Sequence, residues 1–378
     1  MKRVLFVLAN EPTGGVGVFV RDFTGHFDER VRVDFLIYTE QRNTAFQNTI
    51  RKADTRIWYL PELTVRNYLK LLRLTDEFFY VHHREFDAVH LTYPGQVSMV
   101  LKPAKKYGIP CRIIHSFNAS LSDDPIKSIR NKLFIMNYRK YANVYLACSG
   151  NAGRYLYGSK MAESDQVKYI MNAIDCSVFA YDENRRNAFR EELGIREDQK
   201  LILAAGRLEK QKNIGFAAKV FAQIVKKDRS CVLHILGDGP LKADIEKQIQ
   251  ADQTVDHVVF AGFTNRLRDY FMAADLLLFP SLYEGLPITV VDAQCCGLPC
   301  VLSDTISDEV RLTDLISFRS LSDPADAWAD TCLKAMDVKR RSRVDEITEK
   351  GYNIEKEALK LEKIYLDFSA DGEDISAL

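Results

Sequence analysis

Two acidic and two basic side chains stand where a diphosphate and an attached sugar could be held. Glu284 and Asp292 are eight positions apart, on either side of the expected start of a helix that follows an apolar run. Arg207 and Lys212 are five positions apart and follow a second apolar run. Carboxylates accept hydrogen bonds from sugar hydroxyls, and guanidinium and ammonium groups pair with phosphate. These residue types therefore indicate a site for a phosphorylated ligand that is rich in hydroxyl groups.

The segments around the acidic pair are typical of a strand–turn–helix–strand unit. Residues 275–280 have the length and apolar content of a buried parallel strand, and 300–303 read as the next strand. Pro287 suits the first turn of the helix between them. Ligands of open α/β sheets bind at the carboxyl ends of the strands, and a helix start offers free amides and a positive dipole end. A turn of this kind also occurs in units that bind no phosphate, so both interpretations stay open at this point.

Five short motifs carry a resemblance to a known family. Together they resemble the donor-binding signature of the retaining glycosyltransferases of family 4, which have the GT-B fold. The motifs are Ser-Leu-Tyr-Glu-Gly-Leu-Pro at 281–287, Asp-Ala-Gln at 292–294, Gly-Leu-Pro-Cys-Val at 297–301, Gly-Arg-Leu at 206–208 and Gln-Lys-Asn at 211–213.

The resemblance implies roles for the charged residues. In that family the first of two glutamates contacts the hydroxyls of the donor sugar, and the second holds the ribose of the nucleotide. Glu284 matches the first, whereas Asp292 replaces the second and is shorter by one methylene, which predicts a weaker or water-mediated ribose contact. Arg207 and Lys212 match the donor-phosphate motif. The phosphate seat would be completed by the helix start and its turn, namely Gly285, Leu286, Ile288 and Thr289.

The resemblance also implies an α/β fold of two Rossmann-like, doubly wound domains that face each other across a cleft. Residues 1–174 would form an acceptor-binding domain and 175–351 a domain that binds the nucleotide sugar. Residues 352–378 would be a helix that crosses back to the first domain, followed by a tail.

Further candidate residues depend more heavily on the resemblance. Gly14 and Gly15 follow the first strand without a strict Gly-X-Gly-X-X-Gly spacing, and in the family such a loop faces the donor. His115 falls at a strand exit in a stretch similar to a His-Ser-His-Asn element whose second histidine is Phe117 here. A single histidine is more often structural, but the resemblance predicts that His115 contacts the donor sugar or orients the acceptor. Phe263 stands near the loop where family members hold the nucleobase.

Composition excludes several classes of function. The 52 basic residues equal the 52 acidic ones, so no overall positive charge argues for nucleic acid. No run of 18 apolar residues predicts a membrane span, and the N-terminus lacks the pattern of a signal peptide, so a cytoplasmic location is expected. The eight cysteines form no Cys-X-X-Cys pair, and Cys295, Cys296 and Cys300, which sit in an apolar helix–strand unit, are expected to be buried thiols. The basic residues of 125–141 fit either a solvated helix face or a patch for an anionic membrane surface or a lipid diphosphate.

The resemblance predicts an enzyme that moves a hexosyl unit, with retention, from a nucleoside diphosphate sugar to a glycan or polyprenyl-diphosphate-linked acceptor in surface polysaccharide synthesis. UDP is the commoner nucleotide in the family. No Asp-X-Asp motif occurs, so neither a metal nor another cofactor is expected. Two alternatives stay open: a nucleotide-sugar 2-epimerase, and a nucleotide-sugar-binding protein without turnover. The enzyme would be cytoplasmic, either free or peripheral at the inner face of the membrane.

Overall fold

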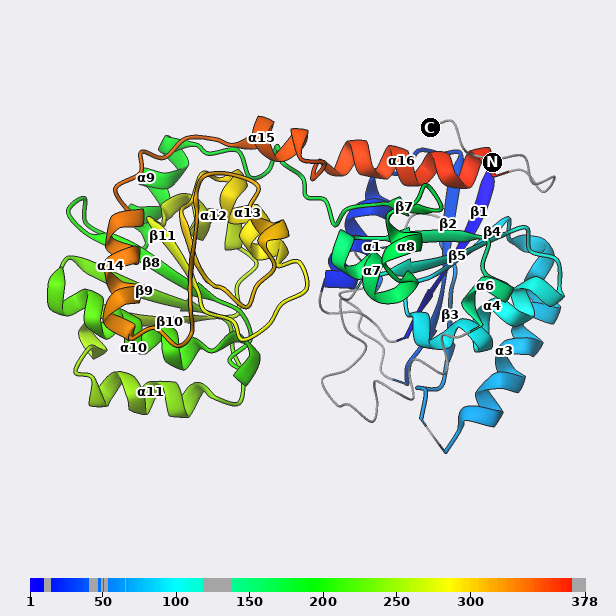
Figure 1. The fold of residues 1–378 in the computed structure, drawn as a ribbon, viewed down its shortest axis with the longest axis horizontal. Helices are drawn as coiled ribbons and strands as arrows, with labels where there is room; N and C mark the ends of the chain where they lie inside the picture. The colour runs from blue at the N-terminus through cyan, green and yellow to red at the C-terminus, as the bar shows by residue number, and fades with distance from the viewer. Residues whose placement is uncertain are drawn as a thin grey trace. The chain divides into compact units, whose positions relative to one another are not determined.

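The chain folds into two compact units, each built on one parallel β-sheet (Figure 1). Unit 1 comprises Met1–Ala173 with Ile354–Leu378, and unit 2 comprises Ile174–Asn353. The computed structural model describes residues 1–9, 15–40, 47–48, 50, 54–64, 66–117 and 137–368.

The sheet of unit 1 has seven strands in the order β3-β2-β1-β4-β5-β6-β7, and every neighbouring pair is parallel. Its strands are β1 (Lys2–Leu8), β2 (Val31–Tyr38), β3 (Ile57–Leu60), β4 (Ala88–Leu91), β5 (Cys111–Ser116), β6 (Val144–Ala147) and β7 (Val167–Tyr169). Its helices are α1 (Gly15–His26), α3 (Tyr68–His82), α4 (Val97–Lys106), α6 (Tyr138–Tyr141), α7 (Gly150–Tyr157), α8 (Ser159–Ala162) and α16 (Ile354–Asp367).

Alternation along the central strand β1 explains why helices cover both faces of this sheet. Successive side chains of a strand point to opposite faces. Phe6 therefore packs in the hydrophobic core that includes α1 and α16. Leu5 and Val7 pack in the core that includes α3 and α4. All three are fully buried, so β1 reads as a continuous apolar run, as expected for an inner parallel strand.

Helix α16 ends the described chain and belongs to unit 1, although it follows unit 2 in sequence. Its buried carboxylates cap loops of that unit. Glu357 accepts a hydrogen bond from the amide of Met171 at 2.9 Å, and Glu362 accepts one from the amide of Asp28 at 2.9 Å. These bonds satisfy polar groups that burial would otherwise leave without a partner.

The sheet of unit 2 has six parallel strands in the order β10-β9-β8-β11-β12-β13. They are β8 (Lys200–Ala205), β9 (Cys231–Leu236), β10 (Val258–Gly262), β11 (Leu276–Phe279), β12 (Cys300–Ser303) and β13 (Ile316–Arg319). Its helices are α9 (Glu183–Glu192), α10 (Ile214–Lys227), α11 (Lys242–Ala251), α12 (Leu267–Ala273), α13 (Ile288–Cys295), α14 (Ala325–Ala335) and α15 (Val344–Glu349).

The strand order of unit 2 reverses between β8 and β11. The chain leaves β8 toward β9 and β10 on one side, and leaves β11 toward β12 and β13 on the other. The loops that follow these two central strands therefore run to opposite sides. Such a reversal of strand order is called a switch point, and doubly wound sheets bind their ligands there. In unit 1 the corresponding reversal lies between β1 and β4.

The predicted fold class, two Rossmann-like doubly wound α/β units, is confirmed by this topology. Pro287 proves to be the residue just before α13 rather than part of its first turn. All eight cysteines are buried free thiols, which confirms the expectation for Cys295, Cys296 and Cys300. Among the described helices, none combines the length and the hydropathy needed to cross a bilayer.

Candidate functional site

Lys212 and Glu284 form an ion pair at the switch point of unit 2. The Lys212 Nζ lies 2.6 Å from Glu284 Oε1, and the side chains are 21% and 9% exposed. The same Nζ lies 4.9 Å from the ring centroid of Phe279, the last residue of β11. The short contact between two partly buried charged groups fixes the direction of both side chains. Two of the four predicted charged residues are thus in contact.

Hydrogen bonds between the two loops explain how Lys212 reaches Glu284. The amide of Leu282 donates to the Gln211 carbonyl at 2.8 Å, and Gln211 Nε2 donates to the Tyr283 carbonyl at 3.0 Å. Asn213 Nδ2 donates to the Pro280 carbonyl at 3.2 Å. The loops after β8 and β11 are therefore joined on both sides of the ion pair. Lys212 was the residue of the Gln-Lys-Asn motif that predicted a phosphate contact. The side-chain amides of Gln211 and Asn213 on either side of it hold the two loops together.

Two glycines allow the ends of β8 and β9 to pack closely beside the pair. A Cβ on Gly237 would lie 2.0 Å from the Gly206 carbonyl oxygen, and Gly237 has a φ of +132°. A Cβ on Gly206 would lie 3.0 Å from side-chain carbons of Lys212, and Gly206 has a φ of +145°. Only glycine fits such positions without strain. The stem of Lys212 thus lies directly against the backbone at the end of β8.

Helix α13 begins four residues after Glu284 and points its amino end at this site. The amides at the start of a helix, here those of Ile288 and Thr289, have no acceptor within the helix and carry the positive end of its dipole. The first turn of α13 contains no acidic residue that would occupy this end. At Gly285 a Cβ would meet nothing within 4 Å, so the turn before the helix is open, whereas Leu286 packs against the core.

Asp292 lies about one turn inside α13 and is 8% exposed. Glu284 precedes the helix, so the predicted placement of the two carboxylates on either side of the helix start is confirmed. The contact of Asp292 with a ribose stays a prediction.

Hydrogen bonds from two hydroxyl groups support the loop of Glu284. They belong to Ser303 and Thr305, which lie outside the sequence motifs. The carbonyl of Ser281 accepts hydrogen bonds from Ser303 Oγ and, at 3.0 Å, from Thr305 Oγ1. Ser303 and Thr305 are also hydrogen-bonded to each other at 2.8 Å. This cluster fixes the carboxyl end of β11 to that of β12. It therefore stabilises the backbone from which Glu284 projects.

The side chains of Arg207 and Phe263 are largely exposed to solvent. The side chain of Arg207 is 74% exposed and pairs with Glu209 Oε1 at 3.1 Å. Phe263 is 88% exposed and directly follows β10, at the same edge of the sheet as the loops of β8 and β11. A large exposed aromatic at a ligand-binding edge offers a stacking surface. Roles for both residues in holding a donor stay predictions.

His115 of unit 1 is fully buried and forms part of a hydrogen-bonded chain. Its Nδ1 lies 3.0 Å from Nε2 of His90, whose Nδ1 lies 2.6 Å from the hydroxyl of Tyr365 in α16. The His115 ring packs against Phe117 at a centroid distance of 4.1 Å and edge-on against Phe19 at 5.2 Å. Within the described residues, its Nε2 has no hydrogen-bond partner. A contact between His115 and a substrate stays a prediction.

Gln96, which the motifs did not single out, lies at the switch point of unit 1. It follows β4 and immediately precedes α4, and it is 1% exposed. Neither its side-chain nitrogen nor its oxygen has a hydrogen-bond partner in the described part of the chain. A buried amide of this kind requires a partner, so it marks the β4–α4 turn as a place for a polar ligand group. Gly14 and, of the basic segment 125–141, Lys127, Arg130 and Lys132 lie outside the described residues, while Gly15 begins α1.

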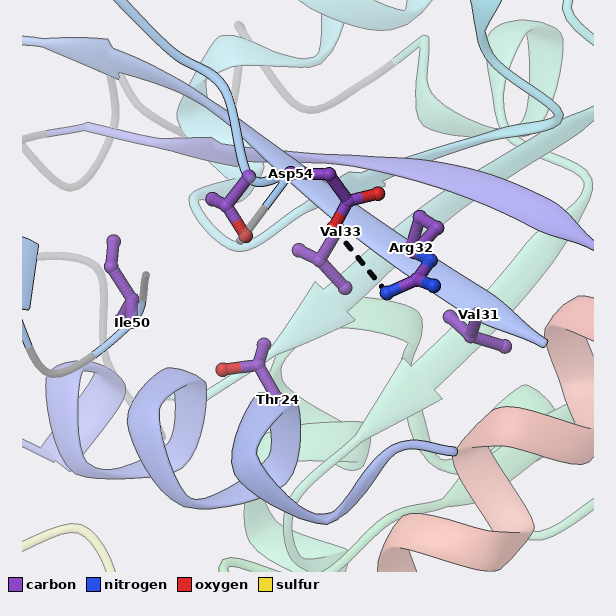
Figure 2. A pocket seen from close by; sticks show the side chains of 7 residues that line it. Thr24, Val31, Arg32, Val33, Ile50 and Asp54 are labelled. Carbon is purple, nitrogen blue, oxygen red and sulfur yellow. Dashed lines mark hydrogen bonds and ion pairs between the residues drawn. The ribbon is translucent and has the colours of Figure 1, made fainter. Parts of the chain in front are cut away.

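A small pocket lies apart from both switch points (Figure 2). Its volume is about 10 Å³, and it is lined by residues of α1, β2 and the segment before β3, with the Arg32–Asp54 ion pair (3.3 Å) beside it. Val31 begins β2, so the pocket is at the amino end of that strand. The volume suits one water molecule. It is not a substrate site.

Comparisons with known proteins agree with this geometry. The family described as glycosyl transferases group 1 matches residues 185–314. A Bacillus subtilis (strain 168) protein named as the glycosyltransferase EpsF is 30% identical over 373 residues, which cover 96% of each chain. This chain is a group 1 glycosyltransferase. An Escherichia coli relative, named UDP-Gal:alpha-D-GlcNAc-diphosphoundecaprenol alpha-1,3-galactosyltransferase, is 25% identical and covers 75% of this chain and 76% of its own length.

Solved structures support the fold of this glycosyltransferase. HepE from Anabaena, solved in complex with UDP, has a TM-score of 0.73 at 16% identity and covers 98% of this chain and 96% of its own. Sucrose-phosphate synthase from Thermosynechococcus elongatus also has a TM-score of 0.73 at 16% identity, with coverages of 97% and 99%. Both are GT-B glycosyltransferases, and the predicted GT-B class is confirmed by these neighbours.

The region that matches the family contains the ion pair and the other candidate residues of unit 2. Arg207, Lys212, Phe263, Glu284 and Asp292 all fall within residues 185–314. The histidine chain of unit 1 falls outside it, so its importance for this glycosyltransferase has to be argued from its own geometry.

The hydrogen-bonded chain of His115, His90 and Tyr365 leads to a prediction about the pH dependence of stability. Burial lowers the pKa of His90 to about 3, and burial together with the nearby His90 holds the pKa of His115 well below its usual 6.5. Below pH 6.5 the two histidines are therefore protonated in the unfolded chain but stay neutral in the folded protein. We expect stability to be lost as the pH falls below about 6.5, by about 1.4 kcal/mol per pH unit for each histidine.

Titration of the histidine ring protons by NMR checks this expectation directly. Both rings should keep their neutral chemical shifts down to pH 5, where an ordinary solvated imidazole is almost fully protonated. Protonation of either ring above pH 6 in the folded protein would contradict the buried, uncharged chain.

Proposed function

We propose that this glycosyltransferase moves a hexosyl unit from a UDP-sugar, with retention, to a glycan carried on a polyprenyl diphosphate. The observation that carries the proposal is the Lys212–Glu284 pair, held beside the amino end of α13 at the switch point of unit 2. The name of the E. coli relative, which includes a UDP-sugar and a lipid diphosphate, supports this choice of donor and acceptor. The complex of HepE with UDP supports the same choice of nucleotide.

The ion pair suits a donor that carries both a negative diphosphate and neutral hydroxyls. When the diphosphate binds, the Lys212 ammonium gains a stronger anionic partner than the single carboxylate of Glu284. Glu284 is then free to accept hydrogen bonds from the sugar hydroxyls. The amides of Ile288 and Thr289 and the solvated Arg207 would share the remaining phosphate charge. Asp292 would hold the ribose, and Phe263 would stack on the uracil.

In the proposed reaction the bond between the anomeric carbon and the diphosphate oxygen breaks first. The diphosphate leaves with the bonding electron pair, and Lys212 and the α13 amides stabilise the charge that develops on it. The acceptor hydroxyl attacks the same face of the sugar, and its proton passes to the leaving diphosphate oxygen. No protein base is required by this scheme. We propose no metal or other cofactor, because Lys212, Arg207 and the helix start supply the positive charge.

The His115 chain and the acceptor complete the proposal. His115 would contact the donor sugar or orient the acceptor, with its ring held by His90. The acceptor is proposed to be part of a surface polysaccharide, assembled at the inner face of the cytoplasmic membrane. The enzyme would then be a cytoplasmic protein that meets its acceptor at a lipid surface.

Calorimetric titration tests the donor part of this proposal. The purified protein is titrated with UDP, GDP and a panel of UDP- and GDP-sugars, and we expect selective heat release with one UDP-sugar. Incubation of that donor alone, followed by NMR, separates transfer from epimerisation, because a 2-epimerase would change the donor without an acceptor. Folded protein that binds none of these nucleotides would overturn the proposed donor.

Transfer to an acceptor provides the second half of the test. The selected donor is mixed with a synthetic polyprenyl diphosphate carrying one sugar, and the anomeric configuration of the product is read by NMR. An α-linked product from an α-linked donor is expected. An inverted product would contradict the retaining mechanism, and binding without any turnover would favour the non-catalytic alternative.

A further inference from the structure

Helix α3 exposes an unusual number of large apolar side chains on one face. Leu69, Tyr80 and Val81 are 79%, 66% and 61% exposed. The opposite face of the helix, which includes Phe78 and Phe79, packs in the core of unit 1. In Figure 1 the light-blue α3 runs along the outside of this unit, next to α4. These three side chains are therefore available to a partner.

Basic side chains share that face and flank the apolar ones. Arg66, Lys70, Arg73 and Arg84 are exposed. Within α3, Lys70 and Arg73 lie one and four positions after Leu69, on the same side of the helix. Arg66 stands just before the helix, and Arg84 lies in the short 3-10 turn that follows it. No ion pair or hydrogen bond engages any of the four within the part of the chain that the structure describes. We call these four bases, together with Leu69, Tyr80 and Val81, the α3 face.

Acidic residues do little to balance the α3 face. Asp76, at its margin, is occupied by Lys106, whose Nζ lies 3.0 Å from Asp76 Oδ1, and it also accepts from the hydroxyl of Tyr107. Glu77 is the one exposed acid of the described helix. An ordinary solvent-facing helix pairs its charges at i, i+4 and keeps its large apolar residues inside. The α3 face does neither.

The combination of unpaired bases and apolar side chains fits an anionic lipid bilayer. Lysine and arginine are attracted to the negative surface of such a membrane, and leucine, valine and tyrosine enter the boundary between head groups and acyl chains. Tyrosine is enriched at that depth because its ring is apolar and its hydroxyl stays hydrated. A nucleic acid would pair with the basic side chains but would leave Leu69 and Val81 exposed to solvent. The chemistry therefore favours lipid.

We propose that the α3 face docks unit 1 on an anionic membrane. The inference deepens the proposed function, on which it rests only for the idea that the acceptor is a lipid. It places the membrane contact on residues other than the basic segment 125–141 that the sequence suggested. Docking by unit 1 would bring the enzyme to the surface in which a polyprenyl-linked acceptor is embedded.

Sedimentation with vesicles tests the α3 face directly. The full-length protein is mixed with vesicles of phosphatidylcholine containing 30% phosphatidylglycerol, and with vesicles of phosphatidylcholine alone, in about 0.1 M salt. We expect binding only to the anionic vesicles, and weaker binding in 0.5 M salt because screening shortens the reach of the charges. The variant Arg66→Gln/Lys70→Gln/Arg73→Gln should bind about a hundredfold more weakly, since each basic residue near the surface contributes about fivefold.

A matched control separates the α3 face from net charge. The variant Lys219→Gln/Lys226→Gln/Lys247→Gln removes the same three charges from exposed positions of unit 2 and should bind like the wild type. A second variant, Leu69→Gln/Tyr80→Gln/Val81→Gln, keeps every charge and should lose at least about tenfold in binding. Circular dichroism and UDP titration of all variants report the fold and the donor site independently of lipid.

Three results would overturn the proposal. The first is wild-type protein that stays in the supernatant with anionic vesicles, and the second is an α3 triple variant that binds as well as the unit 2 control. The third is a concentration-dependent dimer, seen by analytical ultracentrifugation, that the α3 variants abolish, because a second copy would then cover this face. Failure of UDP to bind, with vesicle binding intact, would instead count against the proposed function alone.

Discussion

The variant Glu284→Gln is expected to lower kcat by about 10²- to 10³-fold while the protein stays folded, as found for removal of one group that stabilises a transition state. The substitution keeps the shape of the side chain but removes the negative charge that accepts hydrogen bonds from the sugar. It also deprives Lys212 of its ion-pair partner. Because the lysine side chain is 21% exposed, its ammonium can be solvated, so we expect only a small loss of stability.

The same variant should bind UDP at least as tightly as the wild type does. In the ligand-free protein Glu284 holds the Lys212 ammonium at 2.6 Å, and a diphosphate has to compete with that carboxylate. Calorimetry with UDP, which carries no sugar, isolates this effect from contacts with the sugar hydroxyls. Asp304→Asn is the control, because Asp304 is an exposed carboxylate that follows β12 at the same edge of the sheet. Near-normal turnover by folded Glu284→Gln would show that Glu284 has no role in transfer.

The sequence could predict the location of this site because local patterns determine it. An apolar run that ends in Gly206-Arg207, and another that ends before Glu284, have the length and flanking turns typical of buried parallel strands with their loops at one edge. The helix that follows the first loop, α10 (Ile214–Lys227), likewise carries buried apolar residues at helical spacing. The apolar periodicity of a strand or helix depends only on residues that are close in sequence, which is why these elements could be predicted.

Edge strands show where local pattern stops being informative. The strands β3 (Ile57–Leu60) and β13 (Ile316–Arg319) were not foreseen. Each has four residues and lies at the edge of its sheet, with only one neighbouring strand. A segment this short gains its conformation from pairing with a strand that is already in place. Its own apolar pattern is too brief to distinguish it from a loop.

Contacts between residues that are distant in sequence could also not be predicted from local patterns. His115 was noticed for its place at a strand exit, but its hydrogen-bonded chain ends at Tyr365, which belongs to α16 after the whole of unit 2. Arg207 was expected to share the diphosphate with Lys212, five positions further along the chain, yet in the structure it extends into solvent and pairs with Glu209. Spacing along a loop does not fix side-chain direction, whereas spacing along a helix or strand does. The tertiary contact decides in each case.

The variant Lys212→Met should weaken UDP binding by about 10- to 100-fold, the range expected for the loss of a hydrogen bond to a charged group. Methionine retains the apolar stem that packs along Gly206, so the loop should keep its conformation. The weakening should lie toward the upper end of this range, because Glu284 then faces the diphosphate without its counter-charge and repels it. Titration calorimetry with UDP measures the change.

Two further variants decide whether this interpretation of Lys212 is right. Lys210→Met removes a neighbouring, exposed charge from the same loop and should change UDP affinity by less than about threefold, as expected for a solvated surface charge. The double variant Lys212→Met/Glu284→Gln should recover more affinity than Glu284→Gln gains on its own, because the carboxylate repels the diphosphate most strongly when Lys212 is absent. If Lys210→Met is as damaging as Lys212→Met, the loop provides only a diffuse positive field. If the double variant loses the sum of both single effects, Lys212 and Glu284 act on the donor independently, and the ion pair does not control access to the diphosphate.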